Sequence, residues 1–179
     1  MDIISGFTKA CSKFAMQTAI EFEGEQVSFA QLDSVSNQVA HALLLAGLKK
    51  GDRVAMFCSN CLELVYMAVG ILKAGCIIVP MNSNFKQLEI EHLLSDSGAV
   101  AIFTESSLLE EVPPYQQLLI TKDEAEHGIP FCEFIENMPL TLPSVPIGDD
   151  DGSIMFYTSG TTGKPKGALL SHWNVQSNF

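Results

Sequence analysis

The stretch GDRVAMFCSNCLELVYMAVGILKAGCIIVP, residues 51–80, indicates the fold class of this 179-residue chain. A short apolar segment, RVAMF, precedes a helix-like segment that begins at Asn60, has Glu63 three residues later, and stops at Gly75. A second apolar segment, CIIVP, follows at once. Strands that are apolar throughout, rather than at alternate residues, are typical of parallel sheets covered on both faces. The stretch therefore predicts a strand–helix–strand unit.

The same alternation continues on the amino-terminal side and further along the chain. The segment TAIEFEGEQVSF predicts two short strands around a turn at Glu23 and Gly24. Ser28 and Gln31 form a capping box that opens a helix. Residues 85–95 predict a further helix, and AVAIF predicts a strand.

The remainder is less regular up to the last apolar run. QQLLIT predicts a strand, FCEFIEN a short helix, LTLPSVPIGDDDG a linker and SIMFY, residues 153–157, a short strand. Together these segments predict an α/β fold, in which a mostly parallel sheet is flanked by helices on both faces.

Composition excludes several classes of protein. The chain carries 21 acidic residues against 10 Lys and Arg, a formal charge of −11, so we expect no nucleic-acid partner. Its longest apolar run, residues 64–72, is half a membrane span, so we expect no transmembrane segment. The first residues lack the pattern of a secretory signal. Five cysteines scattered through apolar stretches indicate reduced thiols, and we expect a cytoplasmic protein.

A loop rich in hydrogen-bond donors follows the last apolar run. The stretch YTSGTTGKPKG, residues 157–167, lies beyond the end of a strand, where parallel sheets bind ligands. Its glycines let backbone N–H groups approach a ligand, its hydroxyls add donors, and no Asp or Glu occurs in residues 152–179. These features predict a polyphosphate-binding loop. The candidate residues are Thr158, Ser159, Gly160, Thr161, Thr162, Gly163, Lys164 and Lys166.

Two other interpretations of the loop fit less well. A solvated turn needs no such density of hydroxyls and glycines between two lysines. A Walker loop needs four residues between its glycines and a Ser or Thr after its lysine, whereas Gly160 and Gly163 are separated by two residues and Pro165 follows Lys164. The next residues, GALLSH, indicate a strand. We therefore expect a strand–loop–strand device.

The stretch YTSGTTGKPKGALLSH resembles the signature of the adenylate-forming (AMP-binding) enzymes, which include acyl-CoA synthetases, firefly luciferase and the adenylation domains of peptide synthetases. VSFAQLDSVSNQVAHALLLAGLKKGDRVAMFCSN and AVGILKAGCIIVPMN resemble the opening region of that family, so the resemblance covers the chain from about Thr18 onward. Ala168 stands at a packing position where the family more often has valine. The chain looks most similar to acyl-CoA synthetases.

The resemblance implies a two-step reaction that uses ATP, Mg²⁺ and coenzyme A. A carboxylic acid, expected to be a fatty acid, attacks the α-phosphate of ATP to give an acyl-adenylate and pyrophosphate. Coenzyme A then takes the acyl group as a thioester. The loop would hold the β- and γ-phosphates, while Lys166 would either contact phosphate or pair with an acid. The alternatives are an amino-acid or aryl-acid adenylation domain and a non-catalytic nucleotide-binding or interaction module.

The family's later elements are missing from this sequence, among them the adenine and ribose contacts, the acidic residue for magnesium and the catalytic lysine. We therefore expect residues 1–179 to be the N-terminal subdomain of an AMP-binding domain, truncated within or just after the phosphate-loop strand pair. The resemblance implies no catalytic residue in this piece, which would be inactive alone.

Three other features have weaker functional interpretations. The CSNC stretch, residues 58–61, could be a redox dithiol, but that function leaves the loop unexplained, and zinc would need a second cysteine pair. His172 is expected to pack or hydrogen-bond rather than to catalyse. The acidic run at residues 149–151 is expected to be a solvated linker rather than a metal site.

Overall fold

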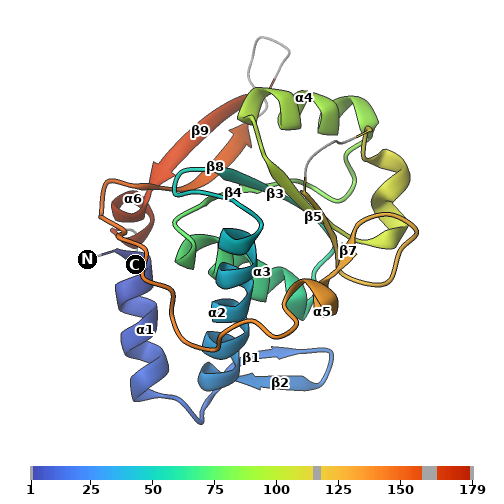
Figure 1. Ribbon diagram of the computed structural model, residues 1–179. Helices are drawn as coiled ribbons and strands as arrows, with labels where there is room; N and C mark the ends of the chain where they lie inside the picture. The colour runs from blue at the N-terminus through green and yellow to red at the C-terminus, as the bar shows by residue number, and fades with distance from the viewer. Residues whose placement is uncertain (1, 115–117, 159–164, 178–179) are drawn as a thin grey trace.

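The computed structural model describes residues 2–114, 118–158 and 165–177, and Figure 1 shows their arrangement. A seven-stranded sheet has the order β7-β6-β5-β3-β4-β8-β9. Every neighbouring pair in it is parallel except β8 and β9, which are antiparallel. The predicted α/β fold with a mostly parallel sheet is therefore confirmed.

The strands of this sheet are short. They are β3 (Arg53–Phe57), β4 (Ile77–Pro80), β5 (Ala101–Thr104), β6 (Leu118–Thr121), β7 (Ile129–Pro130), β8 (Gly152–Thr158) and β9 (Lys166–Ser171). A separate antiparallel hairpin consists of β1 (Thr18–Phe22) and β2 (Glu25–Ser28). Its turn is at Glu23 and Gly24, as predicted, and both residues have positive φ angles.

Helices cover both faces of the sheet. The helices are α1 (Ile3–Lys13), α2 (Phe29–Leu45), α3 (Leu62–Lys73), α4 (Gln87–Ser97), the 3₁₀ helix η1 (Ser106–Glu111), α5 (Phe131–Phe134) and α6 (His172–Gln176). Figure 1 shows α4 on one side of the sheet and α1, α2 and α3 on the other. Among the described residues, no helix combines the length and the apolarity needed to cross a bilayer.

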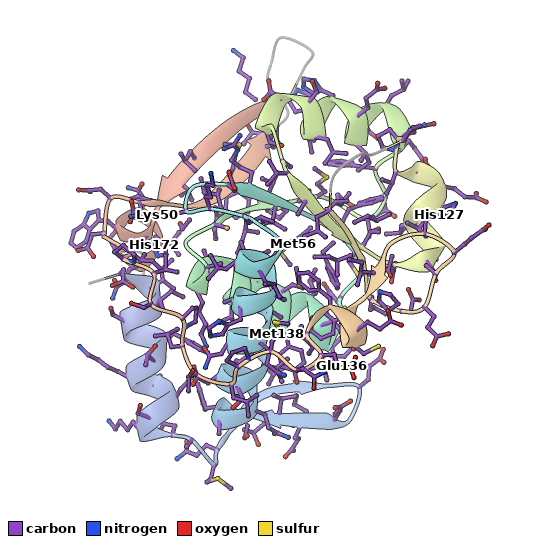
Figure 2. The ribbon with its side chains drawn as sticks, in the orientation of Figure 1. Lys50, Met56, His127, Glu136, Met138 and His172 are labelled. Carbon is purple, nitrogen blue, oxygen red and sulfur yellow. The ribbon has the colours of Figure 1, made fainter. Side chains whose placement is uncertain are left out.

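The two faces form two separate cores because side chains alternate along the central strand. Val54 and Met56 of β3 pack in the core beneath α2 and α3, and Met56 lies at the centre of the molecule in Figure 2. Ala55 and Phe57 pack in the core beneath α4. Residues buried on both faces explain why this strand is apolar at consecutive positions.

Some predicted boundaries were wrong, and some elements were not predicted. Helix α3 begins after Cys61, whose sulfur accepts the Leu64 N–H at 3.3 Å, so Cys61 replaces Asn60 as the capping residue. Helix α4 spans Gln87–Ser97 rather than residues 85–95. The sequence interpretation also missed α1, η1 and β7.

The predicted linker is confirmed as non-regular chain, but it packs closely. It crosses α2 between α5 and β8 (Figure 1). Asn37 Nδ2 donates to the Leu140 carbonyl at 2.7 Å, and His41 Nε2 lies 2.9 Å from the Thr141 carbonyl oxygen.

Candidate functional site

The predicted phosphate loop is framed by the antiparallel strands β8 and β9. Thr158 and Lys166 form the last residue pair of the two strands, at the carboxyl end of β8. Parallel sheets bind ligands at this edge. The predicted loop residues Ser159, Gly160, Thr161, Thr162, Gly163 and Lys164 lie outside the described residues. The predicted strands on both sides of these residues are confirmed, in contrast to the strand and helix that flank a Walker loop.

Two contacts fix this strand pair against the face that α4 covers. The Tyr157 hydroxyl donates to Asp96 Oδ2 at 2.7 Å, and His92 Nε2 lies 3.3 Å from the Pro165 carbonyl oxygen. Burial, together with the hydrogen bond to Asp96, raises the pKa of the Tyr157 phenol, so this group stays neutral and donates. Helix α4 therefore holds both sides of the loop's base.

The opposite face of the strand pair carries Thr158 and Lys166, the two predicted ligand-binding residues that the structure describes. Paired residues of an antiparallel sheet share a face, so Thr158 and Lys166 lie on the face that also presents Ile154 and Phe156. Ile154 packs against the core under α2 and α3, which identifies this face. Phe156 remains 45% exposed there, although it is a large apolar side chain.

A hollow of about 560 Å³ adjoins this face at the carboxyl ends of β3, β4 and β8. We call it the β3–β4–β8 hollow. Its wall is mainly apolar, and its polar side chains come from the loops that follow β3 and β4. The lining residues are Met56, Cys58, Ser59, Asn60, Leu64, Val65, Ala68, Ile78, Pro80, Met81, Asn82, Ser83, Ile154 and Phe156. Phe156 precedes Thr158 by two residues, so the hollow begins beside the base of the loop.

The charges at the base of the loop suit an anion. Residues 152–179 contain no acidic residue. Lys166 is exposed, and no carboxylate pairs with its ammonium group within the described ranges. Lys166 was expected either to contact phosphate or to pair with an acidic side chain. The described part of the chain gives no support for the second role.

A polar cluster beside the hollow was not predicted. Glu105 follows β5, is 7% exposed, and accepts the Ser59 hydroxyl at 2.7 Å and the Lys122 ammonium at 3.2 Å. These hydrogen bonds hold the pKa of Glu105 below its usual value against the opposing effect of burial. The sequence signal was the presence of polar residues just after three of the predicted strands, a position where ligand and structural clusters both form.

The acidic run and His172 are joined at the far side of the strand pair. Asp151 forms an ion pair with Lys50 at 2.7 Å, and its carbonyl accepts the His172 N–H at 2.9 Å; Figure 2 labels Lys50 and His172 close together. His172 is fully buried, as expected for a packing residue. No group of three potential metal ligands occurs among the residues that the structure describes.

The comparisons with known proteins agree with this fold and strand pair. The family described as AMP-binding enzyme matches residues 7–179, so the chain belongs to the family of adenylate-forming enzymes. It is 32% identical over 165 residues to the medium/long-chain-fatty-acid–CoA/3-oxocholest-4-en-26-oate–CoA ligase of Mycolicibacterium smegmatis, covering 85% of this chain and 30% of that protein.

Other similar proteins carry different names. Surfactin synthase subunit 3 of Bacillus subtilis is 32% identical over 88% of this chain, which covers 12% of that protein. The crystal structure of the anthranilate CoA ligase AuaEII in complex with anthranoyl-AMP superposes with a TM-score of 0.88 at 26% identity, covering 96% of this chain and 35% of that one. The chain thus spans about a third of the length of the CoA ligases it matches.

Proposed function

We propose that the complete protein activates a carboxylic acid as an acyl-adenylate and transfers the acyl group to coenzyme A. In this proposal the carboxylic acid is a fatty acid. In this proposal, residues 1–179 form the N-terminal subdomain and supply the pyrophosphate-binding loop. The chain is inactive alone because it lacks the family's later catalytic elements. The observation that carries the proposal is the β8–β9 strand pair, which presents Thr158 and Lys166 on one face at the carboxyl edge of the sheet.

The proposed phosphate contacts follow from the chemistry of the loop. Backbone N–H groups near Gly160 and Gly163 and the hydroxyls of Thr158, Ser159, Thr161 and Thr162 would donate to the β- and γ-phosphates. The Lys164 and Lys166 ammonium groups would neutralise the charge that develops on the leaving pyrophosphate. The absence of acidic residues after Gly152 supports these roles, since no carboxylate competes for the donors.

Magnesium would neutralise phosphate charge in this reaction. The described residues fit a phosphate-bound ion better than an ion held by the protein, because no set of three carboxylate, imidazole or thiol groups gathers among them. The part of the chain described here therefore contributes donors and cations to the nucleotide, and we assign it no magnesium ligand.

The β3–β4–β8 hollow gives this proposal a place for apolar substrate atoms near the phosphates. Its walls are apolar, with Ile154 and Phe156 on the strand that leads to Thr158. The fatty-acid ligase relative supports a medium- or long-chain acid, whereas the match to an anthranilate ligase supports aryl acids as competitors. Amino acids remain the other alternative that the sequence resemblance implies. The test therefore compares these classes of carboxylic acid as substrates.

The test is carboxylate-dependent exchange of radiolabelled pyrophosphate into ATP. It would compare residues 1–179 with the longest natural reading frame that contains them, using fatty, aryl and amino acids in parallel. We expect exchange by the long form alone, with fatty acids preferred. Preference for another acid class would change the substrate assignment. Absence of exchange with every acid, from a folded long form, would favour the non-catalytic module.

A lysine substitution tests the loop itself. In the long form, Lys164→Ala is expected to lower the exchange rate by about 10²–10³-fold, the range for removing one charge-stabilising donor from an active site. Lys49→Ala is the matched control, because Lys49 is exposed and lies between α2 and β3, at the amino edge of the sheet. Equal rates for Lys164→Ala and Lys49→Ala would show that the loop does not hold the leaving group.

A further inference from the structure

The CSNC stretch brings two sulfur atoms together at the junction of β3 and α3. Cys58 Sγ and Cys61 Sγ are 3.9 Å apart, and both cysteines are unoxidised. A disulfide has an S–S distance of about 2.05 Å, so the sulfurs need to approach by roughly 2 Å. Among the described residues, this is the only pair of cysteine sulfurs that contact each other.

We propose that Cys58 and Cys61 form a site of reversible oxidation, where a small disulfide such as oxidised glutathione converts the two thiols into an intramolecular disulfide. The proposal is independent of the adenylating activity and of the phosphate loop. It rests on the geometry of the sulfur pair, on the groups that polarise it, and on the hollows beside it.

The surroundings give the two sulfurs different roles. The Cys61 sulfur accepts the Leu64 N–H at 3.3 Å at the start of α3, where the helix dipole favours negative charge. The contact with Cys58, reinforced by that N–H, lowers the pKa of Cys61 against the effect of burial. The contact with Cys61, together with burial, raises the pKa of Cys58. Cys61 is therefore the attacking thiolate and Cys58 the resolving thiol.

The residues between the two cysteines are held in place. Ser59 donates to Glu105 through its hydroxyl at 2.7 Å and through its N–H at 3.4 Å. Lys122 pairs with the same carboxylate at 3.2 Å. Its positive charge does not oppose the ionisation of a nearby thiol. This anchoring keeps the sulfurs adjacent, so oxidation requires side-chain rotation and a small backbone adjustment rather than unfolding.

Both cysteines border hollows that admit a small molecule, although they are only 7% and 8% exposed. Cys58 lines the β3–β4–β8 hollow. Cys61 lines a hollow of about 380 Å³ on the side of the β1–β2 hairpin, together with Lys122 and three glutamates. A disulfide reagent can therefore approach Cys61 without passing through the core.

The reaction balances as two thiol–disulfide exchanges. The Cys61 thiolate attacks one sulfur of oxidised glutathione, forming a mixed disulfide and releasing one glutathione thiolate. Cys58 loses its proton to that thiolate, and its sulfur attacks Cys61 Sγ, which releases the second glutathione. Two protein thiols are oxidised, and one disulfide is reduced to two glutathione thiols.

The experiment incubates the folded 179-residue chain with oxidised glutathione at pH 7, blocks the remaining thiols with N-ethylmaleimide, and maps the peptides by mass spectrometry. We expect the peptide that contains both Cys58 and Cys61 to carry no N-ethylmaleimide and to be lighter than the reduced peptide by two hydrogens. Buried Cys11 and Cys76 are expected to be alkylated only after denaturation, because burial raises the pKa of each thiol, to about 11 and about 12.

Variants separate the two roles. Cys58→Ser is expected to trap glutathione on Cys61 as a stable mixed disulfide, whereas Cys61→Ser is expected to form neither disulfide. Cys132→Ser is the background for the two cysteine variants, since Cys132 is exposed and would otherwise react by itself; the wild-type chain keeps Cys132 as an internal control for glutathionylation. If Cys58→Ser does not fold, as judged by circular dichroism, the wild-type peptide map alone decides.

Two results would overturn the proposal. One is complete alkylation of Cys58 and Cys61 after treatment that glutathionylates Cys132 in the wild-type chain. The other is a mixed disulfide that forms on Cys58 rather than on Cys61, which would reverse the assigned roles.

Discussion

At the scale of single residues, the least expected feature is a buried ammonium group. The side chain of Lys73, on α3, is fully inaccessible. Its Nζ donates to Asp33 Oδ1 at 2.7 Å, to Asn37 Oδ1 at 2.7 Å and to Ser36 Oγ at 2.9 Å. A buried charge is tolerated only when it is paired and hydrogen-bonded. Helix α2 supplies all three of these partners, so this cluster ties α2 to α3.

Removing the countercharge tests this interpretation. Asp33→Ala is expected to lower the free energy of unfolding by about 3 kcal/mol at pH 7, because it leaves Lys73 charged and buried. Burial already lowers the pKa of Lys73, and losing Asp33 lowers it further. The unfolded chain then binds the proton at a pH where the folded chain does not, so the stability of the variant should rise as the pH increases above 7.

Urea unfolding at pH 7 and pH 9.5 measures both effects. Glu91→Ala, which removes an exposed acid from α4, is the control and should stay within about 0.5 kcal/mol of the wild type. A loss below about 1 kcal/mol for Asp33→Ala, or no recovery at high pH, would mean that the remaining hydrogen bonds alone stabilise the ammonium group.

Capping residues show how far local sequence specifies local structure. Ser28 and Gln31 form the predicted capping box, with the Gln31 N–H donating to Ser28 Oγ at 3.2 Å. At α3 the local rule failed, since asparagine is the better capping residue, yet Cys61 takes that role. The predicted and observed capping residues differ by one position. Tertiary contacts, such as the hydrogen bonds between Ser59 and Glu105, can decide a difference of that size. The contact between the two cysteine sulfurs follows from that shift.

At the scale of elements, the closest approach is between α2 and α3. A Cβ added to Gly70 would overlap the Val39 side chain and lie 3.0 Å from the Ser36 carbonyl oxygen. The glycine therefore allows the two helices to pack closely, which in turn places Lys73 against its partners on α2.

Gly70→Ala tests this packing against helix propensity. Alanine favours a helix by about 1 kcal/mol relative to glycine. The overlap with Val39 should outweigh that gain, and we expect a net loss of about 1–3 kcal/mol in the free energy of unfolding. In the double variant with Val39→Ala, the losses should be less than additive by at least about 0.5 kcal/mol. A Gly70→Ala chain as stable as the wild type would show that the helices can separate without cost.

Periodicity predicted most elements because their patterns are strong, and it failed where patterns are short or were not considered. The buried strands β3, β4 and β5 are apolar runs between helix-like segments, and all were predicted. Strand β7 has two residues, too few for a pattern to be recognised. Helix α1 had a usable signal: Asp2 accepts the Ser5 N–H, and Ile4 and Cys11 lie on one face about two turns apart.

At the scale of the whole molecule, strand order could not be predicted from local sequence. The chain builds β3 to β7 and then returns across α2 to place β8 beside β4. That placement depends on contacts between distant residues, such as Asn37 with Leu140 and Lys50 with Asp151, which leave no local pattern. The strand that precedes the proposed phosphate loop could be predicted, because its apolar run is a local pattern.

The return of the chain also brings its first and last described helices together. Helix α1 contacts α6, and His172 at the start of α6 is buried close to that contact (Figures 1 and 2). The charged groups near its imidazole are Asp2 before α1, Asp149 and Asp151 before β8, and Lys50 after α2. Neither ring nitrogen has a hydrogen-bond partner among the described residues.

This burial predicts a pH-dependent stability that depends on the packing of the two helices. Burial lowers the pKa of His172 below its ordinary value of 6.5, although the three aspartates oppose the shift. Below pH 6.5 the unfolded chain therefore binds a proton before the folded chain does. The free energy of unfolding should fall between pH 7 and pH 5, by at most about 1.4 kcal/mol per pH unit.

Comparison with His172→Phe isolates this contribution, since the two proteins differ in no other side chain. The variant keeps a buried ring of similar shape and should lose less stability than the wild type over the same interval. Deleting residues 1–13 should instead expose His172 and move its pKa, measured by NMR, toward 6.5. If the two 179-residue chains show identical pH profiles, His172 has the same proton affinity in the folded and unfolded chains, and the packing of α1 against α6 does not control its charge.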